Sequence, residues 1–287
     1  MLVARANGKI NLGLEIIGRR PDGYHEIVTI LQQIDLSDRL TFRQAAVLTL
    51  AIDDAALVGE TNLVWRAAKL LQSAMGIARG AEITLEKQIP IAAGLGGGSA
   101  DAAVTLLALN ELWDLGMSID DLVPMARGLG TDVAFFLAGG TQLATGRGDV
   151  VKPLPTPDHW TVLALVAETI TDKTKLLYGS LRPDDFTDGS RTQQIARDLH
   201  EGRPVDSQVV TSGFQRATLD RFPGVREVFK AMSSVGANPH LCGAGPTVLS
   251  LHDSGGEAER VALELRTHGF DARVVRPVAG NSWRLDR

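Results

Sequence analysis

The sequence predicts an α+β fold in two domains, and three observations lead to this prediction. The chain has 287 residues, which is long for one domain and comfortable for two at about 100–200 residues per domain. Strand-like segments come first and helical segments follow, an order typical of α+β proteins. Pro153, Pro155 and Pro157 lie close together, and clustered prolines interrupt helices and strands alike. We therefore expect domains at 1–154 and 155–287.

The N-terminal domain is expected to begin with strands and to continue with helices. Apolar and β-branched residues between short turns predict strands at 9–17, 26–36, 38–43, 46–52 and 81–87. Apolar residues at helical spacing predict helices at 61–75, capped by Thr61 or Asn62, at 100–113, opened by Ser99, and at 118–128, opened by Ser118. Residues 132–145 are predicted to be a buried strand pair around Gly139 and Gly140.

The C-terminal domain alternates between the two kinds of element. We expect strands at 160–167, 246–251 and 270–276, helices at 172–180, 223–233 and 256–267, and a polar stretch at 182–192 followed by a further helix. Strands that alternate with helices in this way indicate an α+β or α/β sandwich.

Charge and composition exclude several classes of protein. The net charge is −5 and the calculated pI is about 5.7, whereas a nucleic-acid-binding protein usually carries a basic face. Cys242 is the only cysteine, so neither a disulfide within the chain nor a thiolate metal site can form. No stretch of 18 apolar residues and no signal-peptide pattern occurs. We expect a cytoplasmic monomer or homodimer that binds a small molecule, with no nucleic acid or membrane partner.

The most informative motif is the glycine-rich run at 94–99, Gly-Leu-Gly-Gly-Gly-Ser, between a predicted strand and a predicted buried helix. A helix N-terminus offers unpaired N–H groups and partial positive charge to a phosphate, and glycine lets the backbone approach that phosphate closely. The alternative is a turn that needs glycine only for tight packing. Four glycines in five residues favour a phosphate site.

Three common nucleotide-binding patterns do not fit this run. The Walker motif needs a lysine after its last glycine, but Ser99 follows Gly98. The dinucleotide motif needs glycine where Ser99 stands, and the signatures of protein kinases are missing.

The run resembles instead the second motif of the GHMP kinases, a superfamily that includes galactokinase, homoserine kinase and mevalonate kinase. Segments 8–12 and 243–247 resemble its first and third motifs, in the same order and across most of the chain. The resemblance implies a ribosomal-protein-S5-like N-terminal domain and a ferredoxin-like α/β sandwich at the C-terminus. It also implies a kinase that uses ATP and Mg²⁺, with its substrates meeting between the domains.

Two catalytic residues follow from the resemblance. Asp132 matches the aspartate that takes the proton of the attacking hydroxyl, although an aspartate after Gly130 is also a common turn or capping residue. Lys9 matches the lysine that stabilises charge on the transferring phosphate. Because side chains two residues apart in a strand lie on the same face, Asn11 is expected to share the face of Lys9. Asn11 is expected to hydrogen-bond the substrate.

The same resemblance implies the ATP site. Lys87 is expected to reach a phosphate or the ribose, and Ser99 is the expected protein contact to magnesium. The residues expected to line the ATP site are Pro90, Ile91, Ala92, Ala93, Gly94, Leu95, Gly96, Gly97, Gly98, Ser99 and Ala100. Glycine is common in the family where this chain has Ala92, serine at Ala100 and alanine at Gly8, and none of these changes removes a charge.

One branch of the superfamily fits best. Segments 18–26, with its Arg-Pro-Asp-Gly-Tyr-His run, and 130–136 resemble the kinases that phosphorylate 4-diphosphocytidyl-2-C-methyl-D-erythritol for isoprenoid precursors by the non-mevalonate route. Tyr24 and His25 then match residues that hold cytosine, Tyr178 matches an aromatic residue on the other face of the base, and Thr174 is expected to bond the ligand. His25 also begins a zinc-protease-like pattern, but Thr29 stands where its second histidine must be.

Two other interpretations stay open. Another GHMP kinase, acting on homoserine or a mevalonate-type alcohol, would leave residues 19–25 unexplained. A non-catalytic nucleotide-binding protein on the same fold would not need both Lys9 and Asp132.

Overall fold

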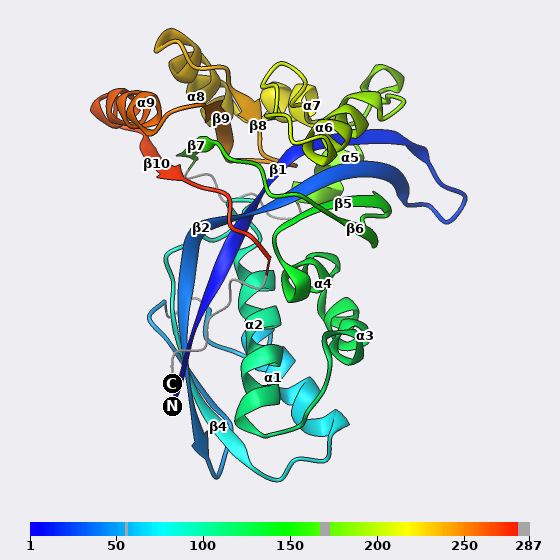
Figure 1. Cartoon of the computed structure of the whole chain (residues 1–287), viewed down its shortest axis with the longest axis vertical. Helices are drawn as coiled ribbons and strands as arrows, with labels where there is room; N and C mark the ends of the chain where they lie inside the picture. Colours follow the sequence, from blue (N-terminus) through cyan, green and yellow to red (C-terminus); the bar gives the residue numbers. More distant parts are fainter. Residues whose placement is uncertain (55–56, 167–172, 281–287) are drawn as a thin grey trace.

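Two β-sheets organise the computed structural model, which describes residues 1–54, 57–166 and 173–280 (Figure 1). The first sheet has six strands in the order β3-β4-β2-β5-β6, with β1 paired to β2, and the second has the order β10-β7-β9-β8. The strands are β1 (Leu2–Arg19), β2 (His25–Ala45), β3 (Thr49–Ile52), β4 (Gly80–Glu86), β5 (Thr141–Gly146), β6 (Val150–Leu154), β7 (Trp160–Leu165), β8 (His240–Leu241), β9 (Val248–His252) and β10 (Asp271–Val275). The predicted α+β class is confirmed.

The long antiparallel pair β1 and β2 joins the two halves of the molecule. In Figure 1 it runs from beside α1 and α2 to the helices of the second sheet. A register shift between Asn7 and Lys9 exchanges the faces of β1: Ala6, before the shift, packs in the core around α2, whereas Ile10, after it, packs in the core shared with the second sheet. The shift therefore turns Lys9 away from that second core.

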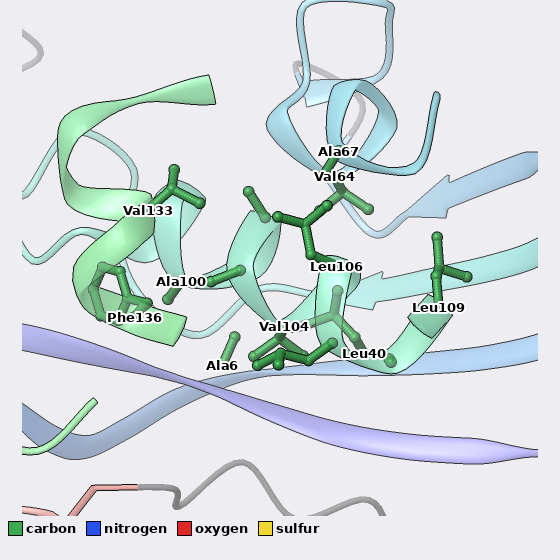
Figure 2. Packing of buried hydrophobic residues seen from close by; sticks show 14 of the residues in the cluster. Ala6, Leu40, Val64, Ala67, Ala100, Val104, Leu106, Leu109, Val133 and Phe136 are labelled. Atoms are coloured by element: carbon green, nitrogen blue, oxygen red, sulfur yellow. The ribbon is translucent and has the colours of Figure 1, made fainter. Parts of the chain in front are cut away.

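Four helices cover one face of the first sheet: α1 (Leu63–Ala74), α2 (Gly97–Leu112), α3 (Ile119–Leu129) and α4 (Thr131–Ala138). Figure 2 shows α2 surrounded by side chains from both long strands, α1 and α4. Residues 100–109 of α2 are all buried, as the apolar sequence of this helix predicts. Asn62 and Ser118 cap α1 and α3 as expected, each accepting a backbone N–H bond.

Three details of the N-terminal prediction are wrong. Residues 26–43 form one strand within β2, and 132–145 form α4 followed by β5 where a strand pair was expected. A short segment that is apolar on every side has the same pattern in a buried helix and in a buried strand. The helix α2 begins at Gly97 with Gly96 as its cap, so Ser99 lies inside its first turn.

The second half contains α5 (Lys173–Tyr178), α6 (Ser190–His200), α7 (Gln215–Arg221), α8 (Pro223–Ser234) and α9 (Gly255–Thr267). Of these, α8 and α9 pack against the second sheet, whereas α6 packs against β1, β2 and β6 of the first. The predicted strands and helices of this half are confirmed within a few residues. Residue 167 of the predicted strand 160–167 and residue 172 of the predicted helix 172–180 lie outside the described residues. The sequence analysis predicted neither α7 nor the two-residue β8. Within the described ranges, no helix is long and apolar enough to cross a membrane.

The first sheet continues into the start of the proline cluster. Pro153 lies within β6, opposite Gln142 of β5, and β6 stands at the edge of the sheet, where a missing N–H can be tolerated. The chain then leads from Leu154 to Trp160, the first residue of the second sheet. The division at 154/155 stays a prediction.

Candidate active site

The glycine-rich turn takes a backbone course that its glycines make possible. Gly94 and Gly96 have φ of 83° and 72°, a left-handed region that favours glycine. A Cβ on Gly94 would lie 2.5 Å from the carbonyl oxygen of Gly245, and one on Gly96 would lie 2.8 Å from Cζ of Phe136. Both positive φ and close packing therefore require glycine at these two positions.

A pocket of about 410 Å³ opens over this turn and the start of α2. We call it the loop pocket. Its lining includes Lys87 and, of the residues predicted to bind ATP, Pro90, Ile91, Ala92, Ala93, Gly94, Leu95, Gly96, Gly97, Gly98 and Ser99. Ala100 is buried in the core and does not line the pocket. The unpaired N–H groups of the first turn of α2 suit a phosphate in this pocket.

Lys87 is held by two buried carboxylates that the sequence analysis missed. Its Nζ lies 2.5 Å from Asp38 Oδ2 and 2.9 Å from Asp101 Oδ2. Burial raises the pKa of Asp101 to about 8, although the charge of Lys87 opposes the shift. Burial opposes protonation of Lys87, but the two carboxylates raise its pKa. The ammonium of Lys87 is thus already paired. An acidic residue two positions after Ser99, at the start of a predicted buried helix, could have indicated Asp101 as one of its partners.

A second pocket, of about 430 Å³, meets the first at the glycine-rich turn. Gly94, Gly96 and Ser99 line both pockets. Because the turn forms the shared wall, a group transferred from one pocket to the other would pass over it. We call the second one the acceptor pocket. Residues predicted to be catalytic or to bind substrate that line it are Lys9, Asn11, Asp132, Thr174 and Tyr178.

Lys9 is fixed by a chain of buried hydrogen bonds. Its Nζ donates to Asn11 Oδ1 at 2.9 Å, and Asn11 Nδ2 donates to Thr29 Oγ1 at 2.8 Å. The hydroxyl of Thr29 donates to the carbonyl oxygen of Gly13 at 2.6 Å. The backbone N–H of Lys9 also donates to Leu95 O at 2.8 Å, which ties β1 to the glycine-rich turn. The shared face predicted for Lys9 and Asn11 is confirmed.

Asp132 enters the acceptor pocket from the first turn of α4. Lys9 lines the same pocket from β1. Two residues more than a hundred positions apart in the chain, Lys9 and Asp132, therefore line one pocket.

Of the aromatic residues predicted to hold cytosine, Tyr178 lines the acceptor pocket. The rings of His25 and Tyr178 stack with centroids 4.6 Å apart and planes inclined by 21°. Burial, and secondarily the charge of Arg19, lowers the pKa of His25. Tyr24 is 58% exposed and does not line the pocket; the guanidinium of Arg147 lies 5.0 Å from its ring centroid. Of these three residues predicted to hold cytosine, Tyr178 lines the acceptor pocket, whereas His25 stacks on Tyr178 and, like Tyr24, does not line the pocket.

The chain is similar over most of its length to proteins of one kinase family. A relative named 4-diphosphocytidyl-2-C-methyl-D-erythritol kinase, from Pelotomaculum thermopropionicum, is 42% identical over 282 residues, which cover 96% of this chain and 98% of that protein. The chain belongs to the 4-diphosphocytidyl-2-C-methyl-D-erythritol kinase family. A kinase of the same name from a Geobacillus species is 35% identical over 95% of both chains, and residues 62–140 match the GHMP kinases N terminal domain.

Solved structures agree with this family. A crystal structure of 4-(cytidine 5'-diphospho)-2C-methyl-D-erythritol kinase has a TM-score of 0.84 and 34% identity, and covers 97% of this chain and 100% of its own. A homoserine kinase from Cytophaga hutchinsonii has a TM-score of 0.74 at 19% identity, over 100% of this chain and 97% of its own. This second likeness shows the shared fold alone.

One departure from the kinase family has a measurable consequence for stability. Ala92 has φ of 58°, a conformation that costs an L-residue about 1–2 kcal/mol. Replacing Ala92 with Gly is expected to raise the free energy of unfolding by about 0.5–1 kcal/mol, because relief of strain outweighs the added freedom of the unfolded chain. Urea denaturation would measure the change. The matched control is Ala93→Gly, at a buried residue with no positive φ, which should lower the same free energy.

Proposed function

We propose that this protein transfers the γ-phosphate of ATP to a hydroxyl of 4-diphosphocytidyl-2-C-methyl-D-erythritol, as a step toward isoprenoid precursors. Family membership supports the substrate. The observation that carries the mechanism is the position of Lys9 and Asp132 in the acceptor pocket, beside the turn shared with the loop pocket. ATP would occupy the loop pocket with its phosphates over the turn.

In this mechanism the acceptor hydroxyl attacks the γ-phosphorus in line. A bond forms between the alcohol oxygen and phosphorus, and the bond to the oxygen bridging the β- and γ-phosphates breaks, so its electron pair leaves with ADP. Asp132 accepts the hydroxyl proton. Lys9, held by Asn11, stabilises the charge on the transferring group, and the N–H groups at the start of α2 stabilise the remaining phosphates.

Magnesium fits this site as a partner of the phosphates. Among the described residues no group of three or more His, Cys, Asp or Glu side chains could cage a metal, and Mg²⁺ in kinases is held mainly by phosphate oxygens and water. Ser99, which lines both pockets, and Asp101, whose Oδ1 is buried without a partner, would face it. The ion would reduce the charge of the ATP phosphates.

Tyr178, which lines the acceptor pocket, and His25, which stacks on Tyr178, would hold the cytosine. Thr174 also lines this pocket and is our proposed polar contact to the ligand. Tyr24, exposed beside Arg147, would reach the base only from the rim. The buried free Cys242 is compatible with a reducing cytoplasm, where we place the protein as a monomer or homodimer.

Replacing Tyr178 with Ala is expected to raise KM for the cytidyl substrate about tenfold, because stacking of an aromatic side chain on a base is worth about 1–3 kcal/mol. KM for ATP should stay unchanged. Steady-state kinetics with each substrate varied in turn would measure both constants. Tyr178→Phe, which keeps the ring, should behave like the unsubstituted protein; an equal rise of KM in both variants would contradict a stacking role.

The proposed function is tested by ADP release from ATP and Mg²⁺ with 4-diphosphocytidyl-2-C-methyl-D-erythritol, homoserine or mevalonate offered separately. We expect turnover only with the cytidyl compound. Turnover with another alcohol would keep the kinase and exclude the cytosine site. ATP binding without turnover on any of the three would favour the non-catalytic interpretation.

A further inference from the structure

Lys173, the first residue of α5, lies between the glycine-rich turn at 94–99 and a second turn at 243–245. Its Nζ donates to the carbonyl oxygen of Gly245 and, at 3.5 Å, to that of Ala92. A Cβ built on Gly94 would lie 3.7 Å from the same Nζ. One ammonium from the second half of the chain therefore reaches the turn that forms the wall between the loop pocket and the acceptor pocket.

The described residues around this ammonium provide it with no counter-charge. Burial, and secondarily the charge of Lys9, lowers the pKa of Lys173 to about 8, and Cys242 opposes the shift. Lys173 lines the acceptor pocket together with Asp132 and Arg147. Among the described residues, no carboxylate forms an ion pair or hydrogen bond with Lys173, and its acceptors there are the two backbone carbonyls.

A partly buried cation without a counter-charge is suited to bind an anion that enters the site. Burial disfavours the charged form of a lysine, and a nearby negative charge restores it. Of the two other lysines at the turn, Lys87 is already paired with Asp38 and Asp101, and Lys9 donates to Asn11 Oδ1. Lys173, whose acceptors are backbone carbonyls, is a further cation positioned to respond when phosphate oxygens arrive over Gly94.

We propose that Lys173 is a second phosphate-binding cation, which leaves the carbonyl oxygens of Ala92 and Gly245 and binds the β- and γ-phosphates of ATP from the side opposite the start of α2. The inference rests on the proposed function and adds a residue to its binding machinery. During transfer, the hydroxyl proton goes to Asp132 and the electron pair of the broken bond leaves with ADP. Lys173 keeps its own proton and supplies charge only.

The alternative role for Lys173 is a structural link between the two turns. A link would lose its hydrogen bonds in Lys173→Met, and the melting temperature would fall. A phosphate-binding cation predicts little change or a rise in melting temperature, because the substitution removes a partly desolvated charge. The two roles therefore differ in a property that can be measured without substrate.

Lys173→Met is expected to lower kcat/KM for ATP by about 100-fold and to leave KM for the cytidyl alcohol nearly unchanged. The matched control is Lys175→Met, two residues on in the same helix, where the side chain is exposed and lines neither pocket. This control should keep the kinetics of the unsubstituted protein. ATP affinity in the presence of Mg²⁺, measured by titration calorimetry, should fall in Lys173→Met alone.

The pH profile gives a second readout. The unprotonated form of Lys173 cannot hold phosphate charge, so kcat/KM for ATP should fall as pH rises through about 8. In Lys173→Arg the guanidinium stays charged over this range, and the fall near pH 8 should disappear. Lys9, Asp132, Arg147 and Cys242 are unchanged in all three variants, so a difference between the pH profiles reports on Lys173.

Equal ATP affinity in Lys173→Met and Lys175→Met would overturn the inference. So would a fall near pH 8 that persists in Lys173→Arg, or a loss of activity that follows a lower melting temperature. If the unsubstituted protein phosphorylates none of the three alcohols, the proposed function fails, and the calorimetric comparison still decides whether Lys173 binds the phosphates.

Discussion

Replacing Asp132 with Asn is expected to lower kcat about 1,000-fold while ATP still binds. The amide has the shape of the carboxylate but cannot accept the proton of the attacking hydroxyl, and general base catalysis contributes about 10²–10⁴-fold. Asp132 lines the acceptor pocket and not the loop pocket, so the substitution should leave the ATP site in place. Single-turnover phosphate transfer would measure the chemical step, and titration calorimetry would measure ATP affinity.

The control for this substitution is Asp120→Asn. Asp120 is an exposed carboxylate in the first turn of the neighbouring helix α3, so its loss changes the net charge equally without touching the site. We expect full turnover in this control. A kcat for Asp132→Asn within a few-fold of the control would exclude Asp132 as the base. A collapse of ATP affinity together with kcat would instead assign it to nucleotide binding.

The parts of the site formed by residues close together in the sequence could be predicted from the residue pattern of a single segment. The glycine-rich run predicted the turn and the helix that follows it, and the two-residue period of a strand predicted the shared face of Lys9 and Asn11, confirmed by their hydrogen bond. The alternation of the strands also predicted most of the second sheet. In each case the structure depends on neighbours in the sequence.

The parts that were missed depend on contacts between distant segments. Helix α4 buries Val133, Phe135 and Phe136 against the first core, and this packing, rather than any periodicity, makes the eight-residue segment a helix. The partner of Lys87 from β2, Asp38, lies 49 positions away. Lys173 meets carbonyls 72 and 81 positions away. No pattern within a segment can predict such contacts, because they arise only when the two sheets and the long strands assemble.

The long strands also explain why catalytic and binding residues from both halves can share one site. The shift between Asn7 and Lys9 turns the lysine toward the glycine-rich turn, and the N–H of Lys9 bonds Leu95 in that turn. Farther along β1, Leu14 packs in the core of the second half. A single strand thus fixes the ATP side of the site and the acceptor side relative to each other.

This arrangement makes Gly96 the residue of the turn whose substitution should have the widest effect. A Cβ there would lie 2.8 Å and 3.0 Å from two ring atoms of Phe136 and 3.1 Å from Cγ of Lys9, and φ is 72°. Gly96→Ala is expected to lower the free energy of unfolding by about 2 kcal/mol, from backbone strain and crowding. It should also lower kcat/KM for ATP about 1,000-fold, because both the cap of α2 and the side chain of Lys9 must move.

The two effects of Gly96→Ala can be separated by a matched glycine. Gly128 is exposed in α3, with no neighbour within 4 Å of an added Cβ and no positive φ. Gly128→Ala should therefore raise the free energy of unfolding by about 0.5–1 kcal/mol and leave the kinetics unchanged. Urea denaturation and ADP release would be measured for both variants. If Gly96→Ala were destabilised but still turned over ATP at the control rate below its unfolding transition, the turn would be a packing element and the phosphates would have to lie elsewhere. A loss of turnover in fully folded Gly96→Ala would instead tie the phosphate site to the cap of α2, where Gly96 lies against Lys9 of β1 and Phe136 of α4.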